Sequence, residues 1–139
     1  VGSGPLENEI KKISIKHSNI DFLGFLPKNK VIPLIRGSFA LLQPSFAEGI
    51  STTILEAMAC KIPIIASNLG GNKELVIDNE NGFLIDPQNI NEMNEKITEL
   101  SENKILVKNF GQKSSELIKN FEWRNVGEKY LKLYESLLI

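Results

Sequence analysis

Cysteine, histidine and long apolar runs are scarce in this sequence, and each scarcity removes a class of protein. Its 139 residues hold one cysteine, Cys60, and one histidine, His17. A single cysteine rules out an internal disulfide and fits a reducing compartment, so we expect a cytoplasmic protein. One cysteine and one histidine do not make the usual zinc site, and we expect no metal or other cofactor. No segment reaches the ~20 apolar residues that span a bilayer, and we see no signal peptide.

Charge of one sign is also lacking. The formal net charge is −1, without the basic excess of nucleic-acid-binding proteins, so we expect no nucleic-acid partner. The composition, 42% hydrophobic and 24% charged, is that of a globular domain long enough to bury a core. Because the chain begins at Val1 rather than a methionine, we interpret it as a fragment.

Apolar runs alternate with helical patterns along the chain. Strands are predicted at Ile20–Phe25, at Phe39–Gln43 with both faces apolar, at Ile62–Ala66 and at Phe83–Ile85. Helices are predicted from Pro5, from Lys28 to Ile35 with a break at Pro33, from Ser51–Thr53, from an Asn72 cap to Asp78, and over Ile90–Ser101, Lys104–Asn120 and Arg124–Leu138. This alternation predicts an α/β fold: a Rossmann-like, three-layer parallel sheet of about four strands with helices on both faces.

The stretch Leu41–Gly71 contains the most informative motif. Glu48 and Glu56 are separated by seven residues that include Gly49 and three hydroxyl residues. A helix beginning at Ser51–Thr53 would offer backbone N–H groups and a positive dipole end to a phosphate. Gly49 would allow close approach of the backbone. The loop lies at the carboxyl end of a predicted parallel strand, where ligands bind in such sheets.

The two carboxylates beside this loop would repel a phosphate. An ionised carboxylate instead accepts hydrogen bonds from neighbouring hydroxyl groups, and a nucleotide sugar presents such groups on both sides of its diphosphate. Two simpler interpretations stay open. Glu56 could close a capping box that starts at Thr53, and Glu48 could be an exposed loop acid. Similarly, Lys28, Lys30 and Arg36 fit either an anion site or plain surface, and His17 fits a helix end better than a catalytic role.

A set of motifs across nearly the whole chain resembles a known family. The residues are Pro44-Ser45, Glu48-Gly49, Glu56-Ala57-Met58-Ala59, Pro63, Ala66-Ser67, Gly70-Gly71 with Glu74, the opening Val1–Pro5, Phe22-Leu23-Gly24, Gly82-Phe83-Leu84 and the Phe121–Tyr134 tail. They resemble the nucleotide-binding half of the retaining glycosyltransferases of family 4, which have the two-domain GT-B architecture. The resemblance implies that residues 1–139 form a partial C-terminal domain without its first strand and without the N-terminal acceptor domain.

The resemblance also implies residue roles. Glu48 matches the catalytic-site glutamate that contacts the donor sugar, and Glu56 matches the one that binds the ribose. The loop residues Gly49, Ile50, Ser51 and Thr52 match the segment whose N–H groups hold the diphosphate. Phe25 to Lys28 match the border of the nucleobase. The implied reaction is hexose transfer with retention to a glycan or lipid-linked acceptor, which the missing half would bind, along with any peripheral membrane contact.

Two departures and two rivals accompany the resemblance. Lys61 stands where the family usually has glycine, which predicts an altered helix end. In the family, the arginine and lysine that clamp the diphosphate precede the position of Val1, so we expect this fragment to bind nucleotide weakly and not to catalyse transfer.

The rival functions are a nucleotide-sugar 2-epimerase, which the Glu56–Ala59 run fits less well, and a non-catalytic nucleotide-sugar-binding module. In the family the last helix crosses to the other domain, so Trp123, Tyr130 and Tyr134 are expected to be exposed.

Overall fold

The computed structural model describes residues 1–138, which divide into two units, residues 1–34 and residues 35–138. The elements in chain order are α1 (Glu7–Lys16), α2 (Lys28–Arg36), β1 (Leu41–Gln43), α3 (Thr52–Ala59), β2 (Ile64–Ser67), α4 (Asn72–Leu75), β3 (Gly82–Ile85), α5 (Ile90–Glu102), α6 (Lys104–Leu117), the 3-10 helix η1 (Ile118–Phe121) and α7 (Trp123–Leu137). The α/β fold is confirmed in the second unit, where every strand follows or precedes a helix.

The sheet of the described residues has three parallel strands in the order β1-β2-β3. Leu41 pairs with Ile64, and Ile64 pairs with Gly82. The central strand, β2, is buried along its whole length, as expected for a parallel strand with neighbours on both edges. The strand predicted at Phe39–Gln43 is present in shorter form as β1, and because it lies at an edge of the sheet Leu42 is 40% exposed.

The main core lies on one face of the sheet. Ile65, Phe83 and Ile85 pack there with Leu100 of α5 and Phe110 of α6. The Phe83 and Phe110 rings meet edge to face with centroids 5.2 Å apart, a favoured aromatic geometry. Partly buried side chains complete the cluster: Ala40, Met93, Ile97, Leu106 and Val107. These contacts attach α5 and α6 to the sheet.

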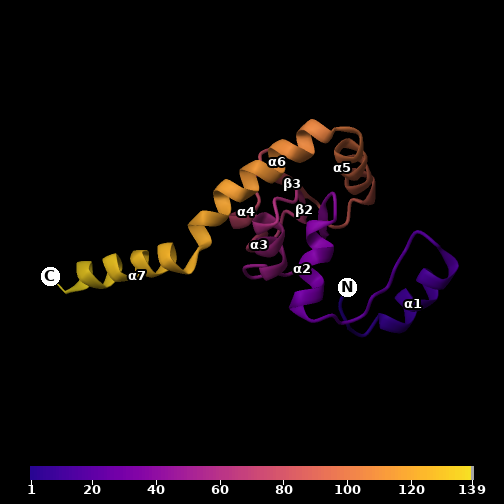
Figure 1. Cartoon of the computed structure of the whole chain (residues 1–139), viewed down its shortest axis with the longest axis horizontal. Helices are drawn as coiled ribbons and strands as arrows, with labels where there is room; N and C mark the ends of the chain where they lie inside the picture. Colours follow the sequence, from indigo (N-terminus) through magenta and orange to yellow (C-terminus); the bar gives the residue numbers. More distant parts are fainter. Residues whose placement is uncertain (139) are drawn as a thin grey trace. The chain divides into compact units, whose positions relative to one another are not determined.

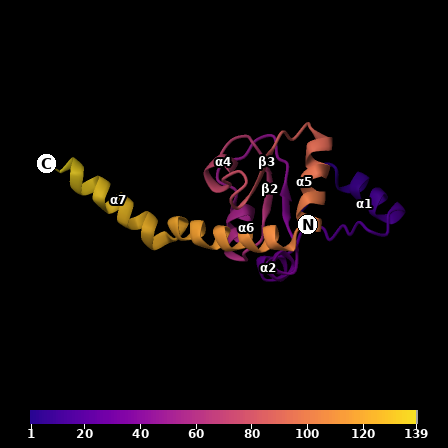
Figure 2. The ribbon, with the colours of Figure 1, turned by 90° about the horizontal axis from the view of Figure 1, so that it is seen from above.

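Helix α3 buries its apolar side, formed by Ile54, Ala57 and Met58, and it contacts β1, β2 and α6. Figure 1 shows β2 and β3 between α5 on one side and α3 with α4 on the other, and Figure 2 agrees for α4 and α5. The three-layer arrangement predicted from the alternation of strands and helices is therefore present in this unit.

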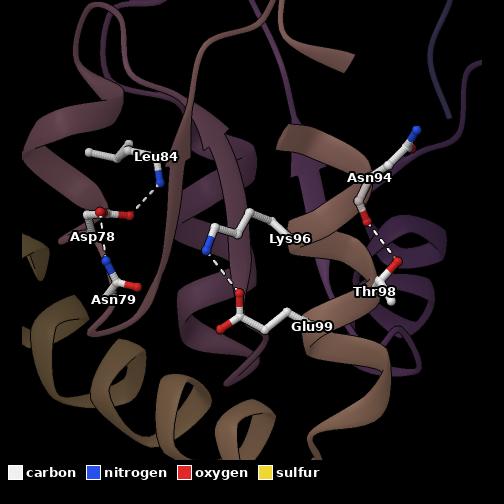
Figure 3. Close-up of polar contacts among 7 residues, drawn as sticks. All are labelled: Asp78, Asn79, Leu84, Asn94, Lys96, Thr98 and Glu99. Atoms are coloured by element: carbon white, nitrogen blue, oxygen red, sulfur yellow. Dashed lines mark hydrogen bonds and ion pairs between the residues drawn. The ribbon is translucent and has the colours of Figure 1, made fainter. Parts of the chain in front are cut away.

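The outer edge of β3 is covered by a side chain (Figure 3). One carboxylate oxygen of Asp78 accepts the backbone N–H of Leu84 at 2.9 Å, and the other accepts from the Asn79 amide at 2.8 Å. The same view shows the ion pair between Lys96 and Glu99 at 2.9 Å on α5. Asp78 thus pairs with the Leu84 N–H that a further strand would otherwise use, which disfavours addition of a strand at this edge.

The end of α3 has a complete Schellman motif. Ile62 N–H donates to Ala57 O at 2.9 Å and Lys61 N–H donates to Met58 O at 3.0 Å, while Lys61 has φ 61°. This left-handed position is the one that glycine usually fills. The predicted alteration of the helix end was therefore wrong: Lys61 adopts the conformation that glycine would, and the hydrogen bonds are kept.

The first unit departs most from prediction. Ile20–Phe25 forms no strand; its one recorded backbone bond to the start of the chain runs from Gly2 N–H to Gly24 O at 2.7 Å. A parallel ladder needs a partner strand, and none is present in the described part of this unit, so the sheet has three strands rather than four. Helix α1 begins at Glu7, two residues after Pro5. Helix α2 continues through the exposed Pro33, so the predicted break is absent.

The C-terminal helices match prediction to within a few residues, except that α6 gives way to η1 at Ile118. Helix α7 buries no residue within the described chain: Trp123 is 89% exposed, Tyr130 56% and Tyr134 59%. The predicted exposure of these three aromatic residues is confirmed. Among residues 1–138 no helix has both the length and the apolar character that a membrane span requires.

Candidate functional site

The loop after β1 lies at the carboxyl edge of the sheet, beside the turn that follows β2. Glu48 is half-buried in this loop. The side-chain amide of Gln43, the last residue of β1, donates to Glu48 Oε1 at 3.0 Å and to Ser45 Oγ at 3.3 Å. Glu48 is therefore a held side chain rather than a loose loop acid, which removes the simpler interpretation of this residue.

The backbone of Glu48 is held from the other side by the Gly70-Gly71 turn. Gly71 N–H donates to Glu48 O at 3.1 Å. A Cβ on Gly70 would lie 2.3 Å from Glu48 O, and one on Gly71 would lie 2.2 Å from Gly49 O. Any side chain at these positions would overlap the loop, so both residues must be glycine for the two backbones to meet.

Helix α3 begins directly after this loop. Ser51 is its N-cap: the buried hydroxyl accepts the Ile54 N–H at 3.4 Å, and Ser51 O accepts the Leu55 N–H. The N–H groups of Thr52 and Thr53 have no carbonyl one turn earlier, as at the start of any helix. Gly49, Ile50 and Thr52 are exposed residues and Thr53 is half-buried. The predicted donor loop Gly49–Thr52 is thus continuous with a helix N-terminus.

Glu56 lies on the second turn of α3, on the face that carries Thr52 and Thr53, opposite the buried Ile54, Ala57 and Met58. Side chains on a helix lean toward its N-terminus, so the Glu56 side chain extends back toward the first turn. The capping-box interpretation was wrong. It requires the acid three residues after the N-cap, and Glu56 stands five after Ser51.

Two buried polar residues, Ser67 and Asn72, support the loop in a role that the sequence did not predict for them. The Ser67 hydroxyl donates to Ser45 O at 2.6 Å, and the Asn72 amide donates to Ser67 Oγ at 2.9 Å. Both side chains are fully buried. Asn72 is not the predicted helix cap; Gly71 precedes α4, and the Asn72 side chain turns back to the end of β2, while α4 ends early at Leu75. Gln43 and Ser67 are each the polar last residue of an otherwise apolar strand. That position was the sequence signal that could have identified them as residues supporting the loop.

The remaining candidate residues lie elsewhere in the chain. Phe25, 77% exposed, and Lys28, the first residue of α2, belong to the unit Val1–Leu34. Lys30 is in the same helix and Arg36 is its last residue, and His17 follows α1 as its C-cap. The stretch between Arg36 and Lys61 has no basic residue. Charge balance for an anion at the start of α3 therefore depends on backbone dipoles and on cations outside this stretch.

Lys113, at the opposite end of the sheet from the candidate site, has a raised pKa. Lys113 of α6 donates to Glu80 at 2.8 Å, and this hydrogen bond and the attraction of the same carboxylate raise the pKa of Lys113. Glu80 belongs to the turn that precedes β3, whereas the candidate site lies after β1 and β2. This ion pair joins a turn to a helix and is not part of the site.

A family profile described as "Glycosyl transferases group 1" matches residues 1–117. The chain is 37% identical over 139 residues to the uncharacterized glycosyltransferase MJ1178 of Methanocaldococcus jannaschii. The aligned region covers 99% of this chain and 40% of that protein. It is 32% identical to the poly(ribitol-phosphate) alpha-N-acetylglucosaminyltransferase of Staphylococcus aureus, with 97% of this chain and 28% of the relative covered.

A solved structure has the same fold. The structure of an S. aureus TarM mutant in complex with fondaparinux, alpha-GlcNAc-glycerol and UDP superposes with a TM-score of 0.81 at 28% identity, covering 94% of this chain and 27% of that one. The present chain thus spans well under half the length of the curated relatives and of the solved structure that it matches here.

Proposed function

The chain belongs to the group 1 glycosyl transferases, and on that premise we propose that its full-length protein transfers a hexose from a nucleotide sugar to a glycan or lipid-linked acceptor with retention of anomeric configuration. The residues described here supply the donor-binding half. Two comparisons support the donor class: the S. aureus relative is named an alpha-N-acetylglucosaminyltransferase, and the TarM structure contains UDP. An alpha-linked product is the outcome expected when a retaining enzyme uses an alpha-linked nucleotide sugar.

The observation that carries the proposal is the placement of two carboxylates around one helix N-terminus. Glu48 precedes α3 and is oriented by Gln43, and Glu56 lies on the solvent side of its second turn. The diphosphate would occupy the space between them, against the N–H groups of Gly49, Ile50, Ser51 and Thr52. Glu48 would then receive hydroxyls of the transferred sugar, and Glu56 those of the ribose. Phe25 and Lys28 are proposed to border the nucleobase.

In this proposal the chemistry at the described residues is mainly electrostatic. The bond between the sugar and the diphosphate breaks, and negative charge develops on the departing diphosphate. Oriented backbone N–H groups and the α3 dipole stabilise that charge without having to reorganise during the reaction. The leaving diphosphate is proposed to take the acceptor proton, so no protein nucleophile is assigned, and no metal ion forms part of the proposal.

Calorimetry on the full-length protein tests the assignment. The probes are UDP, GDP and ADP, each compared with its sugar conjugate: UDP-GlcNAc, GDP-mannose and ADP-glucose. Glu56→Ala is expected to weaken binding of the nucleoside diphosphate and of the nucleotide sugar alike. Glu48→Ala is expected to weaken only the nucleotide sugar. The exposed Glu95 on α5 provides the control, since Glu95→Ala should change neither; equal effects of the two site variants on the nucleoside diphosphate would refute the roles.

Assays of the same full-length protein separate the rival functions. Transfer or hydrolysis of the bound nucleotide sugar supports the transferase, whereas conversion of the sugar to its 2-epimer would support an epimerase. Binding without turnover would indicate a non-catalytic nucleotide-sugar module. For the 139 residues alone we expect weak nucleotide binding and no transfer, because the chain covers 40% of the M. jannaschii relative; robust turnover by the chain alone would contradict this.

A further inference from the structure

The Gly70-Gly71 turn approaches the donor loop more closely than any side chain would permit. The clash at Gly71 is the clearer one, because its φ of −70° suits any amino acid, so the backbone conformation does not require glycine there. The space does: an added Cβ would lie 2.2 Å from Gly49 O, 2.7 Å from Gly49 C and 3.2 Å from Ile50 N. Gly71 is glycine because the backbone of Gly49 and Ile50 occupies the place of a side chain.

The same turn also binds the loop by a directed contact. Gly71 N–H donates to Glu48 O at 3.1 Å, so the turn fixes the carbonyl of the residue whose carboxylate is held by Gln43. Beneath it, Ser67 donates to Ser45 O, and Asn72 donates to Ser67 Oγ, both inside the protein. The loop from Ser45 to Gly49 is therefore held at its start by Ser67 and at its end by Gly71.

From these contacts we propose that Gly71, together with Ser67, is a positioning residue for Glu48 and for the diphosphate-binding backbone of Gly49 and Ile50. Neither residue is assigned a contact with the donor. The inference rests on the proposed function, because it gives Glu48 and the loop a donor to bind. The physical basis is that a loop already held in one geometry loses less conformational entropy on binding. It also keeps its backbone N–H groups oriented toward the diphosphate charge.

The chain offers a matched control for each variant. Gly111 in α6 meets a backbone carbonyl just as closely, since its Cβ would lie 2.2 Å from Lys61 O, but at the far end of α3. Ser114, also fully buried, donates its hydroxyl to a backbone carbonyl, Asn81 O, at 3.4 Å. Gly111→Ala and Ser114→Ala therefore impose similar local damage away from the site.

The test uses the full-length protein with the UDP, GDP and ADP probe pairs named above. At matched loss of thermal stability, Gly71→Ala is expected to lower affinity for the bound nucleotide sugar at least tenfold relative to Gly111→Ala. Ser67→Ala is expected to act in the same direction relative to Ser114→Ala, and it keeps the test open should Gly71→Ala fail to fold. Equal affinities within each pair would overturn the proposal.

Hydrogen exchange of the unliganded proteins gives a readout that a general loss of stability would not reproduce. Amides of residues 45–51 are expected to exchange faster in Gly71→Ala and Ser67→Ala than in their controls. Unchanged exchange there would overturn the positioning role whatever the binding result. If the wild type binds none of the six probes while exchange responds as expected, the proposed function fails and the role of Gly71 and Ser67 in holding the loop stands.

Discussion

At the scale of single residues, Lys61 holds a left-handed conformation (φ 61°) at the end of α3. In this conformation a residue with a Cβ is destabilised by about 1–2 kcal/mol relative to glycine. Glycine recovers only part of that free energy, because it also increases the conformational entropy of the unfolded chain. Lys61→Gly is therefore expected to raise the free energy of unfolding by about 1 kcal/mol, measured by urea denaturation. Lys61→Ala keeps the Cβ and should bring no gain; an equal gain from alanine would mean that charge, not conformation, sets the effect.

Gln43 is the residue-scale test of how Glu48 is oriented. Its amide donates to the Glu48 carboxylate at 3.0 Å, and a hydrogen bond to a charged acceptor is worth about 1.5–3 kcal/mol. Gln43→Ala is expected to weaken nucleotide-sugar binding roughly tenfold or more and to leave nucleoside diphosphate binding unchanged, both by calorimetry. Gln112→Ala removes a similar amide–carboxylate bond on α6 and should change neither; loss of diphosphate binding in Gln43→Ala would contradict the selective role.

At the scale of elements, Phe110 is the buried aromatic side chain that packs α6 against the sheet. Phe110 is 3% exposed and packs edge to face on Phe83. Truncating a buried phenylalanine removes its burial and leaves a cavity, so Phe110→Ala is expected to cost about 3–5 kcal/mol of unfolding free energy. Ile105→Ala, on the same helix at 74% exposure, should stay within about 0.5 kcal/mol. A small loss from Phe110→Ala in thermal or urea unfolding would show that α6 is held elsewhere.

Elements whose pattern is local were predicted well, and those that depend on a partner were not. The apolar periodicity of α5, α6 and α7 and the buried run of β2 are properties of the segments themselves. Ile20–Phe25 has a strand's composition, but pairing decides whether a strand exists, and pairing is not encoded in one segment. Likewise, the glycine turn at Gly70-Gly71 was visible, whereas its approach to Glu48 joins backbones 22 residues apart and follows from packing alone.

At the scale of the whole molecule, α7 presents a continuous apolar surface with nothing of residues 1–138 buried against it. Its exposed large side chains are Trp123, Tyr130, Leu131, Leu133, Tyr134 and Leu137. The Tyr130 and Tyr134 rings lie 6.3 Å apart on successive turns. Exposed surface of this kind is usually a contact site, and from the resemblance to GT-B enzymes we propose that the other domain covers it.

The effect of one substitution in two lengths of protein tests that placement. In the 139-residue chain, Tyr130→Ala removes a side chain that is 56% exposed, so we expect a change within about 0.5 kcal/mol. If the other domain covers α7, the same substitution in the full-length protein removes buried aromatic area and should cost about 2 kcal/mol or more. Urea unfolding monitored by circular dichroism measures the change in unfolding free energy in both lengths of protein. Lys132→Ala, on the same helix and exposed, is the control in each protein. An equally small effect of Tyr130→Ala in both lengths would show that α7 stays uncovered, and its apolar surface would then need another partner.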